Sequence, residues 1–308
     1  MKKIIKLVKN PKKTLQNLFV NYFLRFTAKI WPDELYLKVK YFALMGKHLN
    51  LRNPKSFNEK INWLKLHDRK SLYTTLVDKY TVKKWVADKI GEQYIIPTLG
   101  IWDKFEDIDF DKLPNQFVLK CTHDSGGLAI CKDKQTFDIE NARKKINKSL
   151  KRNFYYIFRE WPYKNVHPRI IAEKYMSDTD EYKDLTDYKF MCFNGKVKIV
   201  FTCTERYSKS GLKVTFFDRK WKLLPFERHY PKSKRKIDKP YNFDKMITIA
   251  EILSKEIPFV RVDLYEINNK IYFGELTFFP GAGFEEFTPS EWDEKIGEML
   301  ILPNTSTL

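Results

Sequence analysis

The chain has 308 residues, and its 57 Lys and Arg outnumber its 39 Asp and Glu, which gives a formal net charge of +18. No run of about 18 apolar residues occurs, so we expect no transmembrane helix. The four cysteines show neither a CxxC pair nor the spacing of a zinc site. Unpaired cysteines are typical of a reducing compartment, which predicts a cytoplasmic protein. Its charge favours anionic partners: nucleotides, acidic polysaccharide, anionic lipid or nucleic acid.

The first 32 residues form a basic segment with eight Lys or Arg and no acid. Lysines interrupt its apolar residues, so we expect no secretory signal. An amphipathic helix on an anionic membrane surface fits this pattern and would attach the protein peripherally to the inner face of the membrane. A helix that packs its stripe on the main domain fits equally well. The apolar residues at helical spacing are Leu15, Leu18, Phe19, Tyr22, Phe23, Phe26 and Ile30.

Residues 33–115 are predicted to be mainly helical. One helix is expected from Phe57 onward, with Ser56 as its N-cap, and another over 77–90. Residues 141–160 have a helical and basic pattern.

Alternating apolar residues predict a strand-rich second half. A helix is expected over 247–257 between the strands, and residues 219–239, with nine basic residues and two acids, predict a mobile basic loop. A β-patterned region begins near Phe117. The further strands are expected over 170–175, 187–193, 196–203, 213–217, 259–266 and 270–276.

Two acids in the C-terminal part predict a metal site. Asp263 and Glu275 lie on two β-patterned runs joined by Asn268-Asn269, a two-residue hairpin signal. An antiparallel hairpin would place the two carboxylates side by side, where they repel unless a cation lies between them. One or two carboxylates with phosphate oxygens commonly hold Mg²⁺. The alternative is a half-exposed hairpin with two unrelated acids.

A second motif indicates a phosphate-binding loop. Lys120 ends a predicted strand, and Ser125, Gly126 and Gly127 follow in a loop before the next strand. Paired glycines let backbone N–H groups approach phosphate oxygens closely, and the lysine adds a positive charge. An ordinary hairpin turn is the alternative.

Together these motifs resemble the ATP-grasp ligases, whose last catalytic hairpin carries Asp and then Glu-x-Asn before a Pro-Gly turn. This chain has Thr277 at the Asn position, a departure shared by the TupA-like branch, which the chain resembles over roughly residues 50 to 290. The segments that carry the resemblance are FNEKINWLK at 57–65, the Asp78-Lys79-Tyr80 helix start, LKCTHDSGG at 119–127, DYKFMCFNGK at 187–196 and GELTFFPGAGFEEFTP at 274–289.

The resemblance implies an α+β chain with the ATP-grasp fold, in which two α/β subdomains with antiparallel sheets clamp ATP after a helical N-terminal region. The basic amphipathic helix expected over 1–32 lies outside the resemblance. The divisions expected after it are a helical region over 33–115, a subdomain with the phosphate loop over 116–176 and a subdomain with the metal site over 177–308.

The resemblance also implies roles for individual residues. The implied ligands of one or two Mg²⁺ ions are Asp263, Glu275 and Thr277. The implied ATP-binding residues are Lys79, Lys120, Ser125, Gly126 and Gly127 for the phosphates and Glu173, Lys174 and Met176 for adenine. The implied catalytic residues are Arg261, which would stabilise the transferring phosphoryl group, and Lys189, which would reach the nucleotide or the acceptor.

The implied activity is an ADP-forming carboxylate–amine ligase of cell-surface polysaccharide synthesis, such as capsule formation. ATP would activate the carboxylate of a uronic acid, and an amine or amino acid would then attack the acyl phosphate. A metal-dependent glycosyltransferase is the alternative, since Asp-x-Asp occurs at 107–109, 109–111 and 178–180. Charge alone would also suit nucleic acid, but no recognition motif accompanies it, so we expect no specific nucleic-acid partner.

Overall fold

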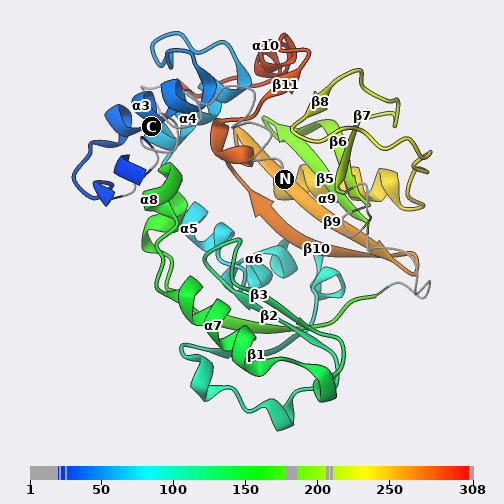
Figure 1. The fold of residues 1–308 in the computed structure, drawn as a ribbon. Helices are drawn as coiled ribbons and strands as arrows, with labels where there is room; N and C mark the ends of the chain where they lie inside the picture. The colour runs from blue at the N-terminus through cyan, green and yellow to red at the C-terminus, as the bar shows by residue number, and fades with distance from the viewer. Residues whose placement is uncertain are drawn as a thin grey trace.

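The computed structural model describes residues 20, 22–24, 26–177, 186–205, 208 and 211–304. Two antiparallel sheets lie in separate halves of the molecule; the helices of residues 33–67 lie near one end of the larger sheet, and those of residues 71–90 lie between the two sheets (Figure 1). The helices are α3 (Asp33–Met45), α4 (Phe57–His67), α5 (Ser71–Val77), α6 (Thr81–Ile90), α7 (Ile139–Leu150), α8 (Tyr155–Phe158), α9 (Phe243–Leu253) and α10 (Trp292–Glu298).

The smaller sheet has the strand order β1-β4-β2-β3. Alternate residues of its strand β2, Phe117, Leu119 and Cys121, are fully buried and pack with Ile146 of α7, which covers this sheet. The first strand precedes the boundary expected at residue 116, so this sheet also uses part of the preceding region. The strands are β1 (Thr98–Trp102), β2 (Phe117–Cys121), β3 (Leu128–Cys131) and β4 (Ile170–Lys174).

The larger sheet has the order β10-β9-β5-β6-β7. Helix α9 covers one face, where Phe190 of β5 packs against Phe243 with ring centroids 6.0 Å apart. Asn268 and Asn269, with φ of 51° and 59°, form the left-handed turn that the sequence predicted between β9 and β10. The strands are β5 (Asp187–Phe193), β6 (Lys196–Thr204), β7 (Lys213–Asp218), β9 (Phe259–Ile267) and β10 (Lys270–Thr277).

Helix α4 connects the N-terminal region to the end of the larger sheet. Ser56 caps it through a capping box with Glu59, as the sequence predicted for Ser56. On one face of the helix, the side chains of Asn58, Asn62 and Lys65 donate to the carbonyl oxygens of residues 285, 283 and 282 at 2.9, 2.8 and 2.6 Å. The loop that follows β10 is therefore held by a helix more than two hundred residues earlier in the chain.

Two predicted helices have different bounds in the structure. The helix expected over 77–90 begins only at Thr81. Asp78 Oδ1 accepts the N–H groups of Tyr80 and Thr81 and so caps the start of α6. The helix expected over 247–257 starts at Phe243 and ends at Leu253, since Phe243 extends its buried face and Pro258 disfavours helical backbone just before it.

Part of the basic loop over 219–239 is anchored and does not match the mobile loop that we expected. It contains β8 (Glu227–Arg228), which pairs with β11 (Phe287–Thr288). Phe226 and Arg228 are 2% and 9% exposed.

Most of the basic N-terminal segment, including Leu15, Leu18 and Phe19, lies outside the described residues. Within the described part of the chain, no helix is long and apolar enough to cross a membrane.

Candidate active site

The hairpin of β9 and β10 places Asp263 directly opposite Glu275, as the sequence predicted. On the other side of β9, Lys189 of β5 lies opposite Asp263. One row across three strands therefore carries a lysine and two carboxylates. The register shifts between Phe273 and Glu275, at Gly274, where an added Cβ would lie 3.1 Å from the carbonyl oxygen of Asp263. Glycine thus lets the two strands approach closely beside the acids.

Arg261 and Lys189 neutralise the acid pair. Arg261 Nε and Nη2 donate to the two oxygens of Asp263 at 2.6 and 2.7 Å, and Nη2 also reaches Glu275 Oε1 at 3.0 Å. Lys189 forms an ion pair with Asp263 and a second one with Asp187 at 2.7 Å. Asp263 is 1% exposed, so a charge there requires such partners.

The two carboxylates differ in their pKa. Burial raises the pKa of Glu275, but the charges of Arg261, Lys79 and Lys189 outweigh burial and bring it to about 2. For Asp263, burial prevails over Arg261 and Lys189, and the pKa is raised. Glu275 is therefore ionised throughout the neutral pH range.

The donor set fits a metal ion that arrives with a nucleotide. Both oxygens of Asp263 already accept from cationic side chains, whereas the side chain of Glu275 is 43% exposed and lines a cavity. Thr277 Oγ1 donates to Glu275 Oε1 at 3.2 Å and lies beside the pair. Among the described residues, no group of three or more His, Cys, Asp or Glu could hold a metal alone. Mg²⁺ with one or two protein carboxylates and several phosphate oxygens suits this arrangement.

Three lysines gather on the opposite side of the cavity. Lys120 pairs with Glu173 of β4 at 2.5 Å, and Lys83 of α6 pairs with the same carboxylate. Lys79 donates to the carbonyl oxygen of Asp124 at 2.5 Å. Burial raises the pKa of Glu173, but Lys120 and Lys83 outweigh burial and lower it. The three ammonium groups face the acid pair, which is a suitable arrangement for a polyphosphate between them.

The N–H groups of the loop that contains Gly126 and Gly127 donate to a side chain and not to the phosphate that we expected. The N–H groups of Gly126 and Gly127 donate to Asp124 Oδ1 at 3.1 and 3.0 Å, and Ser149 Oγ donates to the other oxygen of Asp124. These N–H groups reach a phosphate only if Asp124 releases them. The sequence contains the signal for this, because Asp two residues before Gly is typical of a side chain that bonds to its own loop.

The cavity has a volume of about 270 Å³ and is lined by residues of both sheets. A larger hollow of about 880 Å³ adjoins it and shares Lys83 and Ile95. Arg261, Thr277, Gly126, Lys174 and Met176 are not among the residues lining the smaller cavity. The predicted residues that line it are Lys79, Lys120, Ser125, Gly127, Glu173, Lys189, Asp263 and Glu275.

The predicted adenine-binding residues lie at the end of β4. Glu173 is 5% exposed and held by the lysines. The N–H of Lys174 donates to Pro97 O at 3.0 Å, so an adenine contact at this residue would use its carbonyl oxygen. Met176 follows two residues later, and residues 178–185 lie outside the described part of the chain.

Sequence reasoning missed one lysine of this site. Lys83 reaches Glu173 from α6, four residues after the predicted Lys79. The four-residue spacing of Lys79 and Lys83 was a usable signal.

Comparison with known proteins identifies the family. The model of the TupA-like ATPgrasp family matches residues 59–301. Among curated proteins, no match was found.

Solved structures of several ATP-grasp proteins are similar at low identity. The D-alanine–D-alanine ligase of Bacillus anthracis, complexed with ATP, is 17% identical with a TM-score of 0.39; the match covers 66% of this chain and 54% of the ligase. For the D-alanine–D-alanine ligase of Helicobacter pylori the identity is 14%, the TM-score 0.42 and the coverage 82% and 69%. The ATP-grasp ligase PsnB, complexed with its minimal precursor, Mg and ADP, is 10% identical with a TM-score of 0.37; the match covers 73% of this chain and 60% of PsnB.

The chain thus spans little more than half of the Bacillus ligase. The family match, by contrast, extends from α4 to the end of the larger sheet and beyond, and includes both the lysines and the acid pair. The prediction from the sequence is confirmed: the chain belongs to the TupA-like ATP-grasp family and has the α+β ATP-grasp fold.

Proposed function

We propose that the protein is an ADP-forming ligase that joins the carboxylate of a uronic acid to an amine or amino acid in cell-surface polysaccharide synthesis. The observation that carries the proposal is the pair of Asp263 and Glu275 facing Lys79, Lys83 and Lys120 across one cavity. Acids on one side and lysines on the other suit a metal-bound triphosphate. The solved relatives complexed with ATP, and with Mg and ADP, support this nucleotide.

In this proposal each side of the cavity has its own task. Lys79, Lys83 and Lys120 bind the phosphates and orient them toward the larger sheet. Bound Mg²⁺, held by Asp263 and Glu275, would neutralise phosphate charge. Arg261, which both acids fix in place, stabilises the charge that develops as the phosphoryl group passes to the acceptor carboxylate. The amine then attacks the acyl phosphate, and phosphate leaves as the amide forms.

An acidic acceptor is supported by a second arginine on the same face of the larger sheet. Phe201 lies opposite Lys189 in the next strand, and the guanidinium of Arg228 stacks 4.6 Å from the centre of its ring. Arg228 Nε forms an ion pair with Glu285 Oε2 at 3.4 Å. Arg228 Nη1 has no hydrogen-bond partner among the described residues. A buried guanidinium with an unused N–H group, beside the phosphoryl-transfer residues, suits a carboxylate.

The glycosyltransferase alternative gains no support from its acidic motifs. Asp109 Oδ1 accepts the N–H of Asp111 and so caps a short turn, and Asp109 also pairs with Lys112 at 3.0 Å. The motif over 178–180 lies outside the described residues.

Nucleotide binding is the first test. We expect Mg·ATP to raise the melting temperature of the protein, because a ligand that binds only the folded state stabilises it. Lys120→Ala should remove most of this shift, since it deletes a phosphate-binding charge. The matched control is Lys132→Ala, an exposed lysine one residue beyond the next strand, which should keep the shift. A melting temperature that responds to UDP-sugars alone, with no effect of Mg·ATP, would contradict the proposal.

Substrate class is the second test. ADP release, measured with ATP, an amino acid mixture and UDP-glucuronate or glucuronate, should exceed the release with UDP-glucose. Arg228→Gln should raise KM for the uronate by roughly tenfold or more, because it removes the positive charge and the N–H donor that would bind the carboxylate. Arg235→Gln, at an exposed arginine of the same loop, should not change KM. Sugar transfer or UDP release without ADP would favour the glycosyltransferase instead.

A further inference from the structure

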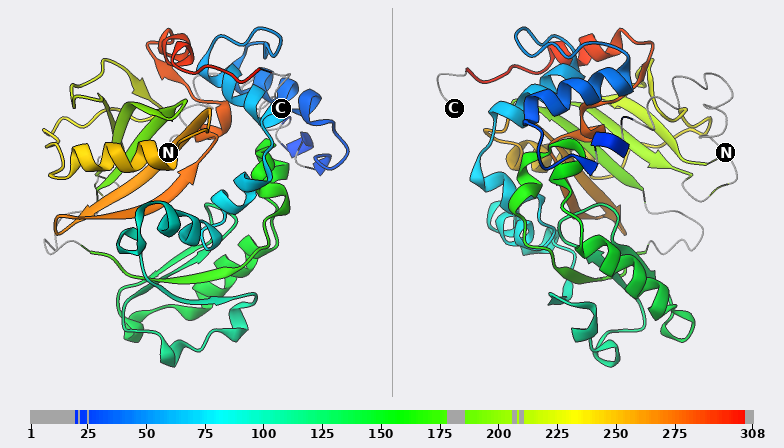
Figure 2. Two further views of the ribbon diagram at one scale, coloured as in Figure 1. Left: turned by 180° about the vertical axis from the view of Figure 1, so that it is seen from behind. Right: turned by 60° about the vertical axis from the view of Figure 1, so that its left-hand side comes forward.

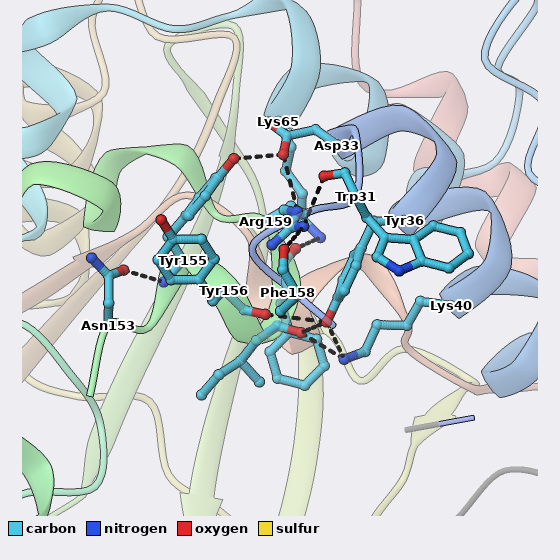
Figure 3. Close-up of polar contacts among 12 residues, drawn as sticks. Trp31, Asp33, Tyr36, Lys40, Lys65, Asn153, Tyr155, Tyr156, Phe158 and Arg159 are labelled. Atoms are coloured by element: carbon cyan, nitrogen blue, oxygen red, sulfur yellow. Dashed lines mark hydrogen bonds and ion pairs between the residues drawn. The ribbon is translucent and has the colours of Figure 1, made fainter. Parts of the chain in front are cut away.

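The N-terminal helical segment that ends before Asp33 is held to the body of the protein by a buried arginine. Arg159 is 1% exposed, and its guanidinium donates to the carbonyl oxygens of Ala28 and Trp31, the latter at 3.2 Å (Figure 3). It also pairs with Asp33 at 3.0 Å and stacks 3.9 Å from the centre of the Tyr36 ring. These contacts connect the end of the segment to the body of the protein.

One side of this segment packs inward. Leu24 and Ala28 are 0% and 4% exposed and form a small apolar cluster with Tyr36. Thr27 continues the helix by donating its N–H to Phe23 O at 3.0 Å, and it accepts the indole N–H of Trp31 at 2.9 Å. The inward side therefore has its own packing and needs no further apolar residues.

The outward side consists of large apolar side chains. Tyr22, Phe26 and Ile30 follow at four-residue intervals and are 74%, 85% and 79% exposed. Single exposed apolar residues are ordinary, but three within nine residues indicate a surface that contacts a partner. The alternative in which the whole apolar stripe packs on the main domain is wrong for these three residues.

The charge of the segment identifies the partner. Eight Lys or Arg and no acid precede Asp33, and Arg25 and Lys29 alternate in sequence with the three exposed residues. Apolar side chains flanked by cations match the boundary between acyl chains and acidic headgroups. We propose that Tyr22, Phe26 and Ile30 insert into the surface of an anionic membrane while the basic residues contact its headgroups. Figures 1 and 2 place this dark blue segment at the edge of the molecule, away from the larger sheet.

Vesicle co-sedimentation of the full chain tests the proposal. The wild type should bind vesicles of phosphatidylcholine with phosphatidylglycerol and should not bind vesicles of phosphatidylcholine alone. Replacing Tyr22, Phe26 and Ile30 together by Ser should lower the partition coefficient by about tenfold or more. The control replaces Tyr241 and Ile301, which are 82% and 71% exposed elsewhere, by Ser and should bind like the wild type.

Several results would overturn the proposal. Unchanged binding of the triple variant would show adsorption by charge alone, and equal binding of the wild type to both kinds of vesicle would exclude selection of acidic lipid. Without vesicles, the triple variant should keep the melting temperature and the molar mass of the wild type. A lower melting temperature would mean that the chain itself covers the three side chains. A change from dimer to monomer would mean that a second copy covers them.

Discussion

Glu275→Gln is expected to lower ATP turnover by about 10²–10³-fold, because it removes a negative charge that would hold the metal ion of Mg·ATP without changing the shape of the side chain. The carboxylate of Glu275 is ionised at neutral pH, since its pKa is about 2. The substitution therefore deletes a full negative charge. The measurement is the rate of ADP formation under saturating Mg·ATP and acceptor.

The fold should tolerate this change. The side chain of Glu275 is 43% exposed, and Arg261 keeps both of its hydrogen bonds to Asp263. We expect a change in the free energy of unfolding within about 1 kcal/mol. Glu294→Gln, at an exposed acid of α10, is the control for the loss of one charge. Wild-type turnover in Glu275→Gln would refute the assignment of this residue to the metal.

Asn58→Ala should produce the largest loss of stability, about 3–5 kcal/mol in the free energy of unfolding. Asn58 is fully buried, and its amide group satisfies both backbone groups of Glu285: Nδ2 donates to the carbonyl oxygen at 2.9 Å, and Oδ1 accepts the N–H at 2.7 Å. Alanine would leave both groups unpaired in the interior, and each costs roughly 1–3 kcal/mol. Urea unfolding at a fixed temperature measures the difference.

The matched control is Asn53→Ala, which removes an exposed amide just before α4 and should cost less than about 0.5 kcal/mol. The two variants separate burial from residue type. Equal stability of Asn58→Ala and Asn53→Ala would mean that α4 does not hold the loop after β10.

Local patterns in the sequence predicted the larger sheet well. The hairpins at Asn194-Gly195 and Asn268-Asn269 carry the residues that left-handed turns require. Regular antiparallel register from the second hairpin brings Asp263 to Gly274, and the register shift at Gly274 then places Glu275 opposite Asp263.

The features of the site that the sequence did not predict depend on contacts between segments far apart in the chain. The pairing of Lys83 with Glu173 joins residues ninety apart in the chain, and Ser149 reaches Asp124 from another helix. Both α4 and the loop after β10 belong to the segments that carry the family resemblance. Nothing in either one indicates that Asn58 bonds to Glu285.

The link between α4 and the loop after β10 also orders events during protein synthesis. Asn58 and Glu285 are 227 residues apart, so a ribosome that adds about 5–20 residues per second takes roughly 11–45 s between them. During this time the last strand of the smaller sheet, which ends at residue 174, is synthesised before the first strand of the larger sheet. The buried amides of α4 meet their partners only after residue 285 has been synthesised. A nascent chain that has not reached this residue therefore lacks the contacts that hold the loop after β10.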